Sequence, residues 1–525
     1  MTRLYLSILA FMLLLSACGQ KTERAPNTFV ESSIGDARRL NPVIANDSAS
    51  GAINDQVFTG LVKYDKDIRL IGDLAERWTV SNSGKTITFH LRKNVKWHDG
   101  VEFTADDCLF TYKKFIDPNV ATPYSSSYMD VSKAEVLDKY TFRVTYKEPF
   151  SPALESWAMG IIPKHLLEGK DINTDPFNRH PIGTGPYKFK EWISGQKIVL
   201  EANPDYYEGR PNIDQFIYRI IPDSSTMFQE LLSGGVDFMG LNPLQYLRKS
   251  ETRRIRDNYR KFRYPANAFT YLGYNLTSPL FDSVSVRQAL SYAINRQSII
   301  DGIVLGIGRP STGPYAHVSW AYNPDARSYA YDPERARRML KEAGWSDANS
   351  DGILEKDGRP FRFTIITNQG NTQRIRTAEI IQQNLKAIGV DANIRVMEWQ
   401  AFLEQIDKRS FDAMILGWSL SRDPDLYDIW HSSKTKKGEY NFIGYKNAEV
   451  DRLLVEGRRT FDIEKRRKIY FRIHEILAEE QPYAFLYVPD ATPIVHKRFK
   501  GIEPAPLGIT YNFIKWYVPK DRMEW

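Results

Sequence analysis

The sequence predicts an α/β protein made of more than one lobe. The chain has 525 residues, which is too long for one ordinary core and favours two or three lobes. The first half is rich in strand-like alternation, whereas strands and helices alternate from about residue 266. With 42% apolar and 13% aromatic residues, the chain can build large cores and a cleft lined by aromatic side chains.

The N-terminus predicts export and a lipid anchor. A basic residue precedes an apolar stretch over residues 4–15, the layout of a secretory signal that is too short to remain as a membrane-spanning helix. The ending Leu15 to Cys18 resembles the bacterial lipobox, in which the cysteine is acylated and becomes the mature N-terminus. We therefore expect a lipoprotein signal peptide over residues 1–17, lipidation of Cys18 and a tether over 18–26. Ordinary cleavage beside an incidental cysteine is the alternative.

Charge and cysteine content narrow the class further. The net charge of +7 comes from 71 basic and 64 acidic residues without long runs, whereas a nucleic-acid-binding protein normally shows a clustered basic stripe. We expect no nucleic-acid partner. Cys108 is the only cysteine besides Cys18, so lipidation of Cys18 leaves no intramolecular disulfide. Cys108 is expected to be a small buried apolar residue.

Strand patterns dominate the segment before residue 150. Residues 86–97 and 140–146 alternate apolar and polar side chains, as half-buried strands do. The stretch SNSGK (81–85) carries the asparagine and glycine of a hairpin turn. It also resembles the end of a phosphate loop, but the first glycine of that motif is missing. We expect a hairpin here.

Helix signals become complete after residue 330. Asp332 can cap a helix, Pro333 fits its first turn and Gly344 can end it. Residues 361–367 are predicted as a strand and residues 377–390 as a helix. A second strand over 390–399 follows, and this order implies a parallel pair with a right-handed crossover.

The next strand carries the first candidate site. A helix over 400–408 leads into the strand 411–418, which ends at Trp418. Ligands of open α/β sheets gather beyond the carboxyl ends of the strands. Trp418 therefore marks an expected ligand floor.

The stretch from Asp347 to Gly358 leaves two interpretations open. Asp347, Asn349 and Asp351 match the first half of a calcium-binding loop. Gly358 stands where that loop needs a bidentate glutamate. An Asx-rich turn followed by a hairpin over residues 356–358 is the other interpretation, and the one we favour. Beyond this calcium candidate, we expect neither a metal site nor a cofactor.

Two carboxylates follow the strand end. Asp423 and Asp425 could act as general acid and base, but nothing supplies a partnered nucleophile or a metal, and no nucleophile elbow or zincin motif occurs. A surface-anchored hydrolase that uses these two aspartates is kept as an alternative. The residues as a whole favour a binding protein and not an enzyme.

Several segments together resemble the family 5 solute-binding proteins of bacterial ABC importers, the dipeptide- and oligopeptide-binding class. The block from Leu74 to Phe115 is similar to the signature of the family. Further motifs follow in the order of the family: GTGPYKF (183–189), NPDYYEGRPNID (203–214), YNLTSPLFDSVSVRQALSYAINR (274–296) and YDPERARRMLKEAGW (331–345).

The resemblance implies an α/β fold like that of the type II periplasmic binding proteins. Two α/β lobes would enclose a cleft by hinge closure, and a strand-rich third lobe would be inserted. Lobe I would comprise residues 27–62, 181–265 and 490–525. Lobe II, the insert, would comprise residues 63–180, and lobe III residues 266–489.

The resemblance also implies a ligand site between lobes I and III. One wall would follow the segment from Leu40 to Pro42, and the other would be the strand end that carries Trp418. The expected ligand-binding residues are Asn46, Asp47, Ser48, Tyr124, Gln373, Trp399, Gly417, Trp418, Ser419, Leu420, Ser421, Asp423 and Asp425.

Ser421 departs from the pattern of the family. Peptide binders of this family commonly place an aspartate there, which pairs with the α-ammonium of the peptide. A neutral hydroxyl does not match a charge-assisted bond. Either Asp423 or Asp425 takes over that contact, or the ligand lacks a free amine there, or a longer ligand is anchored elsewhere.

The implied function is a substrate-binding lipoprotein that delivers peptides to an ABC permease. The ligand would be held by main-chain hydrogen bonds, as an added strand. A non-peptide solute, such as a metal chelate or an oligosaccharide, is the alternative within the class. We expect an extracytoplasmic monomer, held at the membrane through Cys18.

Overall fold

The computed structural model describes residues 26–506 and 508–523, so the predicted signal peptide, Cys18 and most of the tether lie outside the described residues. The first sheet has seven strands in the order β12-β22-β11-β1-β10-β9-β8. They are β1 (Thr28–Ser33), β8 (Tyr187–Ile193), β9 (Lys197–Ala202), β10 (Gln215–Ile220), β11 (Phe238–Gly240), β12 (Tyr259–Lys261) and β22 (Pro493–His496). Helices α2 (Ser48–Val57), α6 (Ser224–Ser233) and α7 (Arg253–Asn258) accompany this sheet. These elements lie in the ranges predicted for lobe I, whose exact limits stay a prediction.

The insert is built on antiparallel strands. A four-stranded sheet has the order β4-β5-β7-β6, and β2 pairs with β3 beside it. The predicted hairpin is confirmed, because β4 and β5 pair across a turn in which Asn82, Ser83 and Gly84 all have positive φ. Cys108 is fully buried, as predicted. The elements are β2 (Val62–Tyr64), β3 (Leu70–Gly72), β4 (Ala75–Ser81), β5 (Thr86–Leu91), α3 (Ala105–Ile116), β6 (Val131–Asp138), β7 (Thr141–Tyr146), α4 (Ala153–Ser156) and α5 (Lys164–Leu167).

The third body has the order β13-β21-β14-β20-β18-β19, and β15 pairs with β21. The predicted parallel pair is confirmed, since β18 and β19 are parallel and α11 joins them. Asp332 caps α10, also as predicted. The strands are β13 (Tyr264–Pro265), β14 (Ala268–Tyr274), β15 (Gly308–Pro310), β18 (Arg362–Asn368), β19 (Asp391–Met397), β20 (Ala413–Ser419) and β21 (Tyr483–Ala491). The helices are α8 (Val284–Ala293), α9 (Arg296–Ile299), α10 (Pro333–Glu342), α11 (Thr372–Lys386), α12 (Trp399–Asp407), α13 (Tyr427–Trp430), α14 (Ala448–Arg459) and α15 (Ile463–Glu480).

Apolar packing separates lobe III from lobes I and II. Alternate residues of β20 point to different cores: Ala413 and Ile415 join the core that includes α11, whereas Met414 and Leu416 join the core that includes α15. The sheet of lobe III is therefore covered on both faces, while one continuous core is shared by lobes I and II. Lobe III can thus rotate against the other two as a unit.

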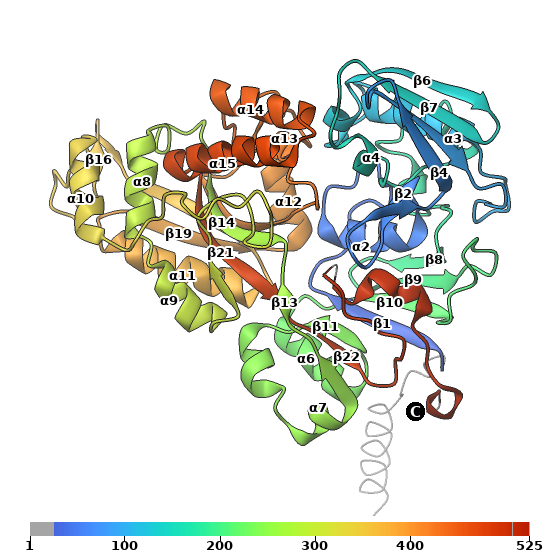
Figure 1. Cartoon of the computed structure of the whole chain (residues 1–525). Coiled ribbons are helices and arrows are strands. Elements are labelled where there is room, and N and C mark those ends of the chain that lie inside the picture. Colours follow the sequence, from blue (N-terminus) through green and yellow to red (C-terminus); the bar gives the residue numbers. More distant parts are fainter. Residues whose placement is uncertain (1–25, 507, 524–525) are drawn as a thin grey trace, which may run out of the picture.

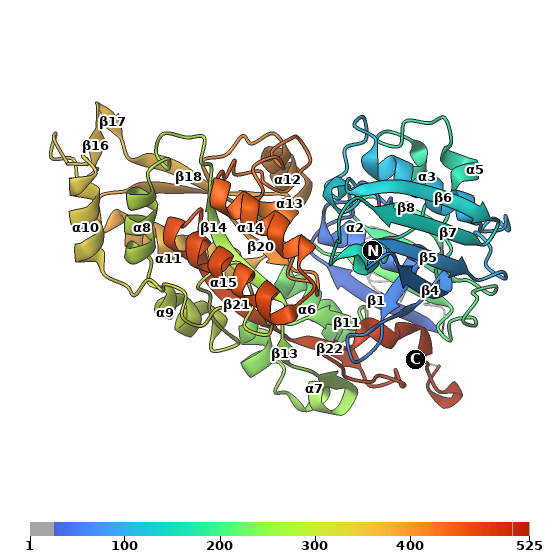
Figure 2. The same cartoon turned by 45° about the horizontal axis from the view of Figure 1, so that its top comes forward.

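The connection between lobes I and III is narrow. The chain passes from β12 through β13 into β14, and it returns from β21 into β22. β13 pairs with β21 at the crossing, through Tyr264 with Ala491 and Pro265 with Asp490. Figures 1 and 2 show lobe III on one side of these strands and lobes I and II on the other. Paired extended strands of this kind can act as a hinge.

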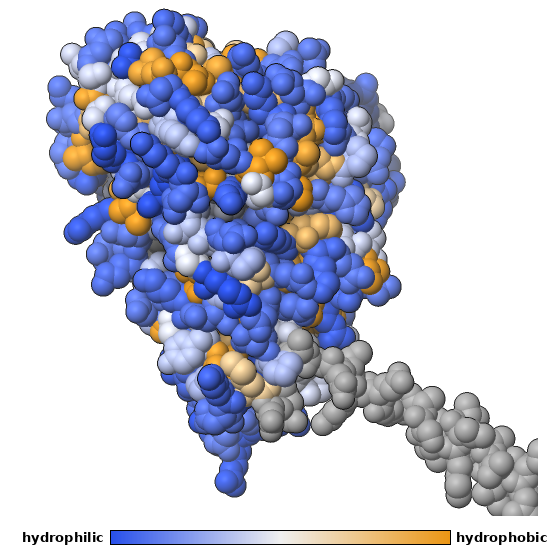
Figure 3. All heavy atoms as spheres, turned by 90° about the vertical axis from the view of Figure 1, so that its right-hand side faces the viewer, coloured by the Kyte–Doolittle hydropathy of each residue, from blue (hydrophilic) through white to orange (hydrophobic). Residues whose placement is uncertain are grey.

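The face of the molecule on the side of lobes I and II is mostly hydrophilic. Figure 3 shows the face on the side of lobes I and II, where apolar side chains form small separate patches among polar ones. Among the described residues, no helix is both long enough and apolar enough to cross a membrane.

Candidate functional site between the lobes

One wall of the interlobe space is the end of β20. This strand pairs with β14 from Ala413 to Ser419, but it pairs with β18 only through Ala413 and Met414. Within the described sheet, the last residues of β20 therefore have one edge without a strand partner. Such an edge can take an additional strand through its main-chain groups.

Trp418 is fixed at this edge by aromatic packing. Its ring stacks on Phe442 at 5.7 Å and meets Tyr440 edge-on at 5.1 Å. Its Nε1 donates to the Tyr483 hydroxyl at 3.4 Å. The following residues turn away from the strand, because Asn267 donates to the carbonyls of Leu420 and Ser421. The exposed edge is thus held rigid before any ligand arrives.

The opposite wall is the N-terminal half of α2. Asp47 caps this helix and accepts hydrogen bonds from the amide and hydroxyl of Ser50. Asn46 and Ser48 flank the cap, and both are at least partly accessible. A β-carbon added to Gly51, one turn further on, would meet nothing within 4 Å. The outward face of α2 therefore borders open space.

Direct contacts join the two sides. Tyr440 of lobe III donates to the Tyr124 hydroxyl of lobe II at 3.1 Å, and Tyr124 donates to the Ala45 carbonyl of lobe I at 2.7 Å. Trp399 packs so closely on Gly35 that a β-carbon there would lie 2.6 Å from the indole. The lobes are thus closed on each other, and glycine is required at position 35.

Charged contacts reinforce this closure. Arg38 of lobe I pairs with Asp407 of lobe III at 2.6 Å. Gln400, one residue after Trp399, donates to the main-chain carbonyls of Asp36 and Ala37. Because these bonds join different lobes, they can exist only when the lobes are closed.

The predicted rim carboxylates are both held by arginines. Asp423 accepts from both Nη atoms of Arg466 at 2.6 Å, and Asp425 accepts from Arg458 at 2.7–2.8 Å. A ligand ammonium could reach either carboxylate only by displacing a buried guanidinium. The same pairing removes a free acid–base couple. Ser421, in turn, donates to the Asp423 carbonyl.

Gln373 lies at the hinge rather than beside Trp418. It lines a cavity of about 390 Å³ between lobe I and the start of α11, together with Ile34, Tyr264 and Thr492. Its neighbour Arg374 donates to the Asn368 side chain at 2.8 Å, and the Arg374 Nε has no hydrogen-bond partner among the described residues. Sequence reasoning did not single out Arg374, whose unpaired donor becomes evident only where β18 and β20 end beside it.

Two further carboxylates were not identified from the sequence, Glu31 on β1 and Asp55 on α2. Burial raises the pKa of Glu31 to about 7 and that of Asp55 to about 6. Asp55 nevertheless keeps an accessible surface. Asp55 shares the outward face of α2 with Gly51, and Glu31 lies on β1 four residues before Gly35, on which Trp399 packs. We therefore place these two acids on the lobe I side of the interlobe space.

The aspartates of the calcium candidate accept hydrogen bonds from backbone amides of their own loop. Asp347 accepts from the Gly352 amide and Asp351 from the Ile353 amide. The hairpin predicted beside it is confirmed by β16 (Glu355–Lys356) and β17 (Arg359–Pro360). No group of three or more histidine, cysteine or acidic side chains suited to a metal occurs within the described ranges.

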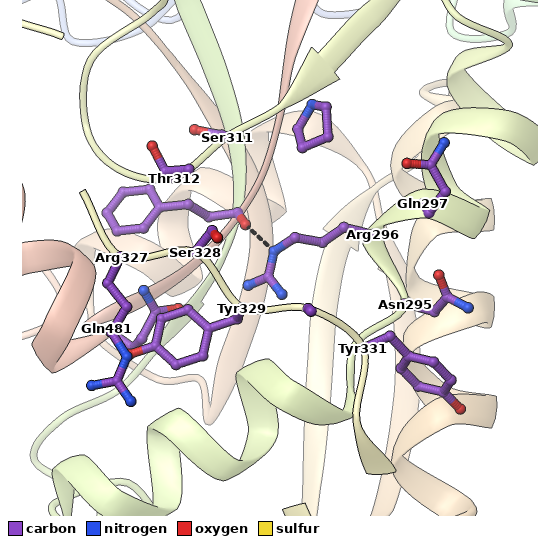
Figure 4. A pocket seen from close by; sticks show the side chains of 13 residues that line it. Asn295, Arg296, Gln297, Ser311, Thr312, Arg327, Ser328, Tyr329, Tyr331 and Gln481 are labelled. Atoms are coloured by element: carbon purple, nitrogen blue, oxygen red, sulfur yellow. Dashed lines mark hydrogen bonds between the residues drawn. The ribbon is translucent and has the colours of Figure 1, made fainter. Parts of the chain in front are cut away.

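A second cavity, of about 340 Å³, lies inside lobe III (Figure 4). Its central cation, Arg296, donates to the carbonyls of Phe485 and Ser291, and Arg327 pairs with Glu479 at 2.7 Å. Ser311 and Gln481 are also hydrogen-bonded within the lobe. Arg296 thereby ties α9 to β21, the other groups have partners within lobe III, and the interlobe space remains the stronger candidate site.

Two α/β lobes joined by a pair of strands, with aromatic and polar walls meeting between them, define a solute-binding protein of the periplasmic type. Residues 69–440 match the bacterial extracellular solute-binding proteins, family 5 (middle part). The chain belongs to this family. It is therefore an extracytoplasmic, non-enzymatic component of solute transport.

Individual relatives agree with this assignment. The chain is 38% identical to the oligopeptide-binding protein AppA of Bacillus subtilis over 503 residues, which cover 94% of this chain and 91% of AppA. The structure of AppA in complex with a nonapeptide superposes with a TM-score of 0.90 at 36% identity, over 94% of this chain and 99% of that one. NikZ of Campylobacter jejuni, in complex with Ni(L-His), gives 0.85 at 30% identity, with coverage of 94% and 99%. The predicted fold class is confirmed.

Proposed function

We propose that this protein captures peptides between lobes I and III and delivers them to an ABC permease. The similarity to AppA, whose structure holds a nonapeptide, supports an oligopeptide as the ligand. Asn46, Asp47, Ser48 and Tyr124 on one side, and Trp399 with residues 417–421 on the other, are the proposed contacts. Gln373 would contribute from the hinge.

The observation that carries this proposal is the single-sided pairing of β20. The Ile415 carbonyl accepts from the Thr367 hydroxyl, so the free edge begins after Ile415. An extended peptide can pair there, because the following main-chain groups lack a strand partner on the side away from β14 within the described sheet. Recognition through the main chain is independent of side chains, so it suits an importer of varied peptides. Trp418 would then cover one face of the bound strand.

Delivery needs a place at the membrane. We propose that Cys18 carries the lipid anchor and that the body from residue 27 onward acts as a monomer beside its permease. Closure of lobe III on lobes I and II would be the signal that the permease recognises, since ligand and closed lobes stabilise each other.

Mass spectrometry of ligand released from natively purified full-length protein tests the proposal first. Peptides should be recovered. After unfolding and refolding to remove that ligand, titration should show saturable binding of a nonapeptide by tryptophan fluorescence. The same nonapeptide with N-methylated backbone amides should bind at least tenfold more weakly, because each lost main-chain bond contributes about 1 kcal/mol.

Two results would contradict different parts of the proposal, the ligand class and the mode of binding. Recovery of a metal chelate or an oligosaccharide in place of peptides, together with no peptide binding at millimolar concentration, would replace the ligand class. Equal binding of the methylated and unmethylated peptides would exclude strand addition at β20.

A further inference from the structure

Glu31 and Asp55 come from different elements of lobe I. Glu31 lies on the central strand β1, between Tyr218 of β10 and Phe238 of β11. Asp55 lies on the outward face of α2, one turn beyond Gly51. Space is open beside Gly51, so no element among the described residues covers this face of the helix at that position.

Electrostatic neighbours place both acids on one wall. Besides burial, Glu31 and Asp47 raise the pKa of Tyr218. Burial raises the pKa of Tyr124 to about 12, and Asp47 and Asp55 contribute to that rise. Asp47 is therefore the neighbour common to both ends of the wall. We call these three carboxylates, Glu31, Asp47 and Asp55, the acidic wall.

Few lysine or arginine side chains are available to pair with the acidic wall. Neither Glu31 nor Asp55 accepts a hydrogen bond or forms an ion pair within the part of the chain that the structure describes. Nearby cations have other partners: Arg38 pairs with Asp407, and Lys434 with Asp428 and Glu439. Within the acidic wall, Arg38 and Arg39 act favourably on Asp47, and Arg39 acts on Asp407 as well.

An isolated carboxylate that is partly withdrawn from water is costly, and a cation beside it removes most of that cost. We propose that the ligand carries a cationic group, an ammonium or a guanidinium, which the closed lobes hold against Glu31 and Asp55. This inference rests on the proposed peptide function and narrows it to peptides that present positive charge to lobe I. It also explains why position 421 can be a serine: the cationic group of the ligand would bind to carboxylates of lobe I and not to an acid of lobe III.

The proposal has a protonic consequence. Because burial holds the pKa of Glu31 near 7 and that of Asp55 near 6, both acids are partly protonated in the empty protein near neutral pH. A bound cation favours the ionised form. Binding should therefore release protons between about pH 5.5 and 7.5, and affinity for a cationic peptide should rise with pH over that window.

The charge of the ligand is tested with matched peptides on refolded, ligand-free full-length protein. One nonapeptide contains two lysines and a free amino terminus. A second has both lysines acetylated, a third has only its amino terminus acetylated, and a fourth has both changes. Calorimetry in two buffers of different ionisation enthalpy measures affinity and proton release together.

Variants assign the effect to the wall. Glu31→Gln and Asp55→Asn keep side-chain size and remove charge, and the double variant combines them. Glu191→Gln on β8 and Asp205→Asn in the turn before β10 are the matched controls, since both carboxylates are exposed in the same lobe.

At least one acetylation should weaken binding to the wild type about tenfold or more, the range of a charge-assisted bond. Whether lysine or amino-terminal acetylation does so identifies the source of the cation. In the double variant this difference should fall below threefold and proton release should disappear, while the controls keep both.

Two results overturn the inference and leave peptide capture intact. In the first, all four peptides bind the wild type with equal affinity. In the second, the double variant keeps the full preference for charge. Failure of every peptide to bind would instead contradict the proposed function itself, so the two failures are distinguishable.

Discussion

The two sides of the interlobe space handle negative charge in opposite ways. On lobe III, Asp423 is gripped by Arg466 and Asp425 by Arg458, and each of these four side chains is at most 15% exposed. On lobe I, Glu31 and Asp55 have no cationic partner among the described residues. Carboxylates that look alike in the sequence therefore serve different purposes: the paired ones fix the rim, and the unpaired ones leave a charge for the ligand to neutralise.

This difference also locates specificity. A paired carboxylate offers a ligand little, because a new cation must first break a buried ion pair. An unpaired carboxylate attracts a cation from the start. The free edge of β20 is indifferent to ligand sequence, so selectivity in this protein should arise on lobe I, and affinity for the peptide main chain on lobe III.

The largest expected effect, on stability, comes from removing one partner of the ion pair between Asp423 and Arg466 on lobe III. Asp423→Asn leaves the Arg466 guanidinium, 6% exposed, without its carboxylate. The free energy of unfolding should fall by about 3 kcal/mol, measured by denaturant titration followed through tryptophan fluorescence. Peptide affinity of the folded protein should stay within about twofold of the wild type.

A double variant supplies the control. Asp423→Asn combined with Arg466→Met removes both charges and should regain most of the lost stability. If Asp423→Asn instead left stability unchanged and weakened only peptides with a free amino terminus, Asp423 would be the ammonium site, and the contrast between the two walls would fail.

A smaller effect of the opposite sign is expected on the unpaired side. Burial raises the pKa of Glu31 from 4.5 to about 7, so between these pH values the folded protein keeps a proton that the unfolded chain has lost. Stability of the empty protein must then fall as pH rises through this window. The full rise of this pKa corresponds to about 3 kcal/mol, and contact of the partly accessible side chain with solvent reduces it. Glu31→Gln should therefore be as stable as the wild type below pH 4.5 and about 2 kcal/mol more stable at pH 8.

Unfolding curves at several pH values check this sign. Exposed Glu191→Gln on β8 is the control, and its stability should follow the wild type at every pH. A Glu31→Gln variant that is less stable at pH 8 would show that Glu31 has a cationic partner in solution.

Local signals in the sequence were sufficient for the elements. The cap at Asp332, the apolar strand pattern of residues 361–367 and the turn residues around Gly84 each depend on neighbours a few positions away, and the structure confirms all three elements. The end of β20 was also predictable as a ligand floor, because strand ends in open sheets are determined by topology. That role stays a prediction until a ligand is measured.

The charge pattern was not predictable in the same way. Asp423 pairs with Arg466, 43 positions later in the sequence, and Asp425 pairs with Arg458, 33 positions later. No local sequence pattern predicts such pairs. Asp55 looks like an ordinary exposed residue on a helix face. Only the closed arrangement of the lobes shows that lobe III places no lysine or arginine beside Asp55. Sequence periodicity reports burial within one element, whereas pairing depends on how separate lobes meet.

The smallest expected effect concerns the contact that joins the two walls. Tyr440→Phe removes the hydroxyl that donates to Tyr124 at 3.1 Å and keeps the edge-on contact with Trp418. Because this bond forms only between closed lobes, its loss should cost about 1 kcal/mol of closure and weaken peptide binding about fivefold. Thermal stability should hardly change. Tyr206→Phe, which removes a hydroxyl bonded to Tyr207 within lobe I at 3.4 Å, is the control and should leave affinity unchanged. Equal affinities for wild type and Tyr440→Phe would mean that ligand binding does not draw on this closure, and that the walls act independently.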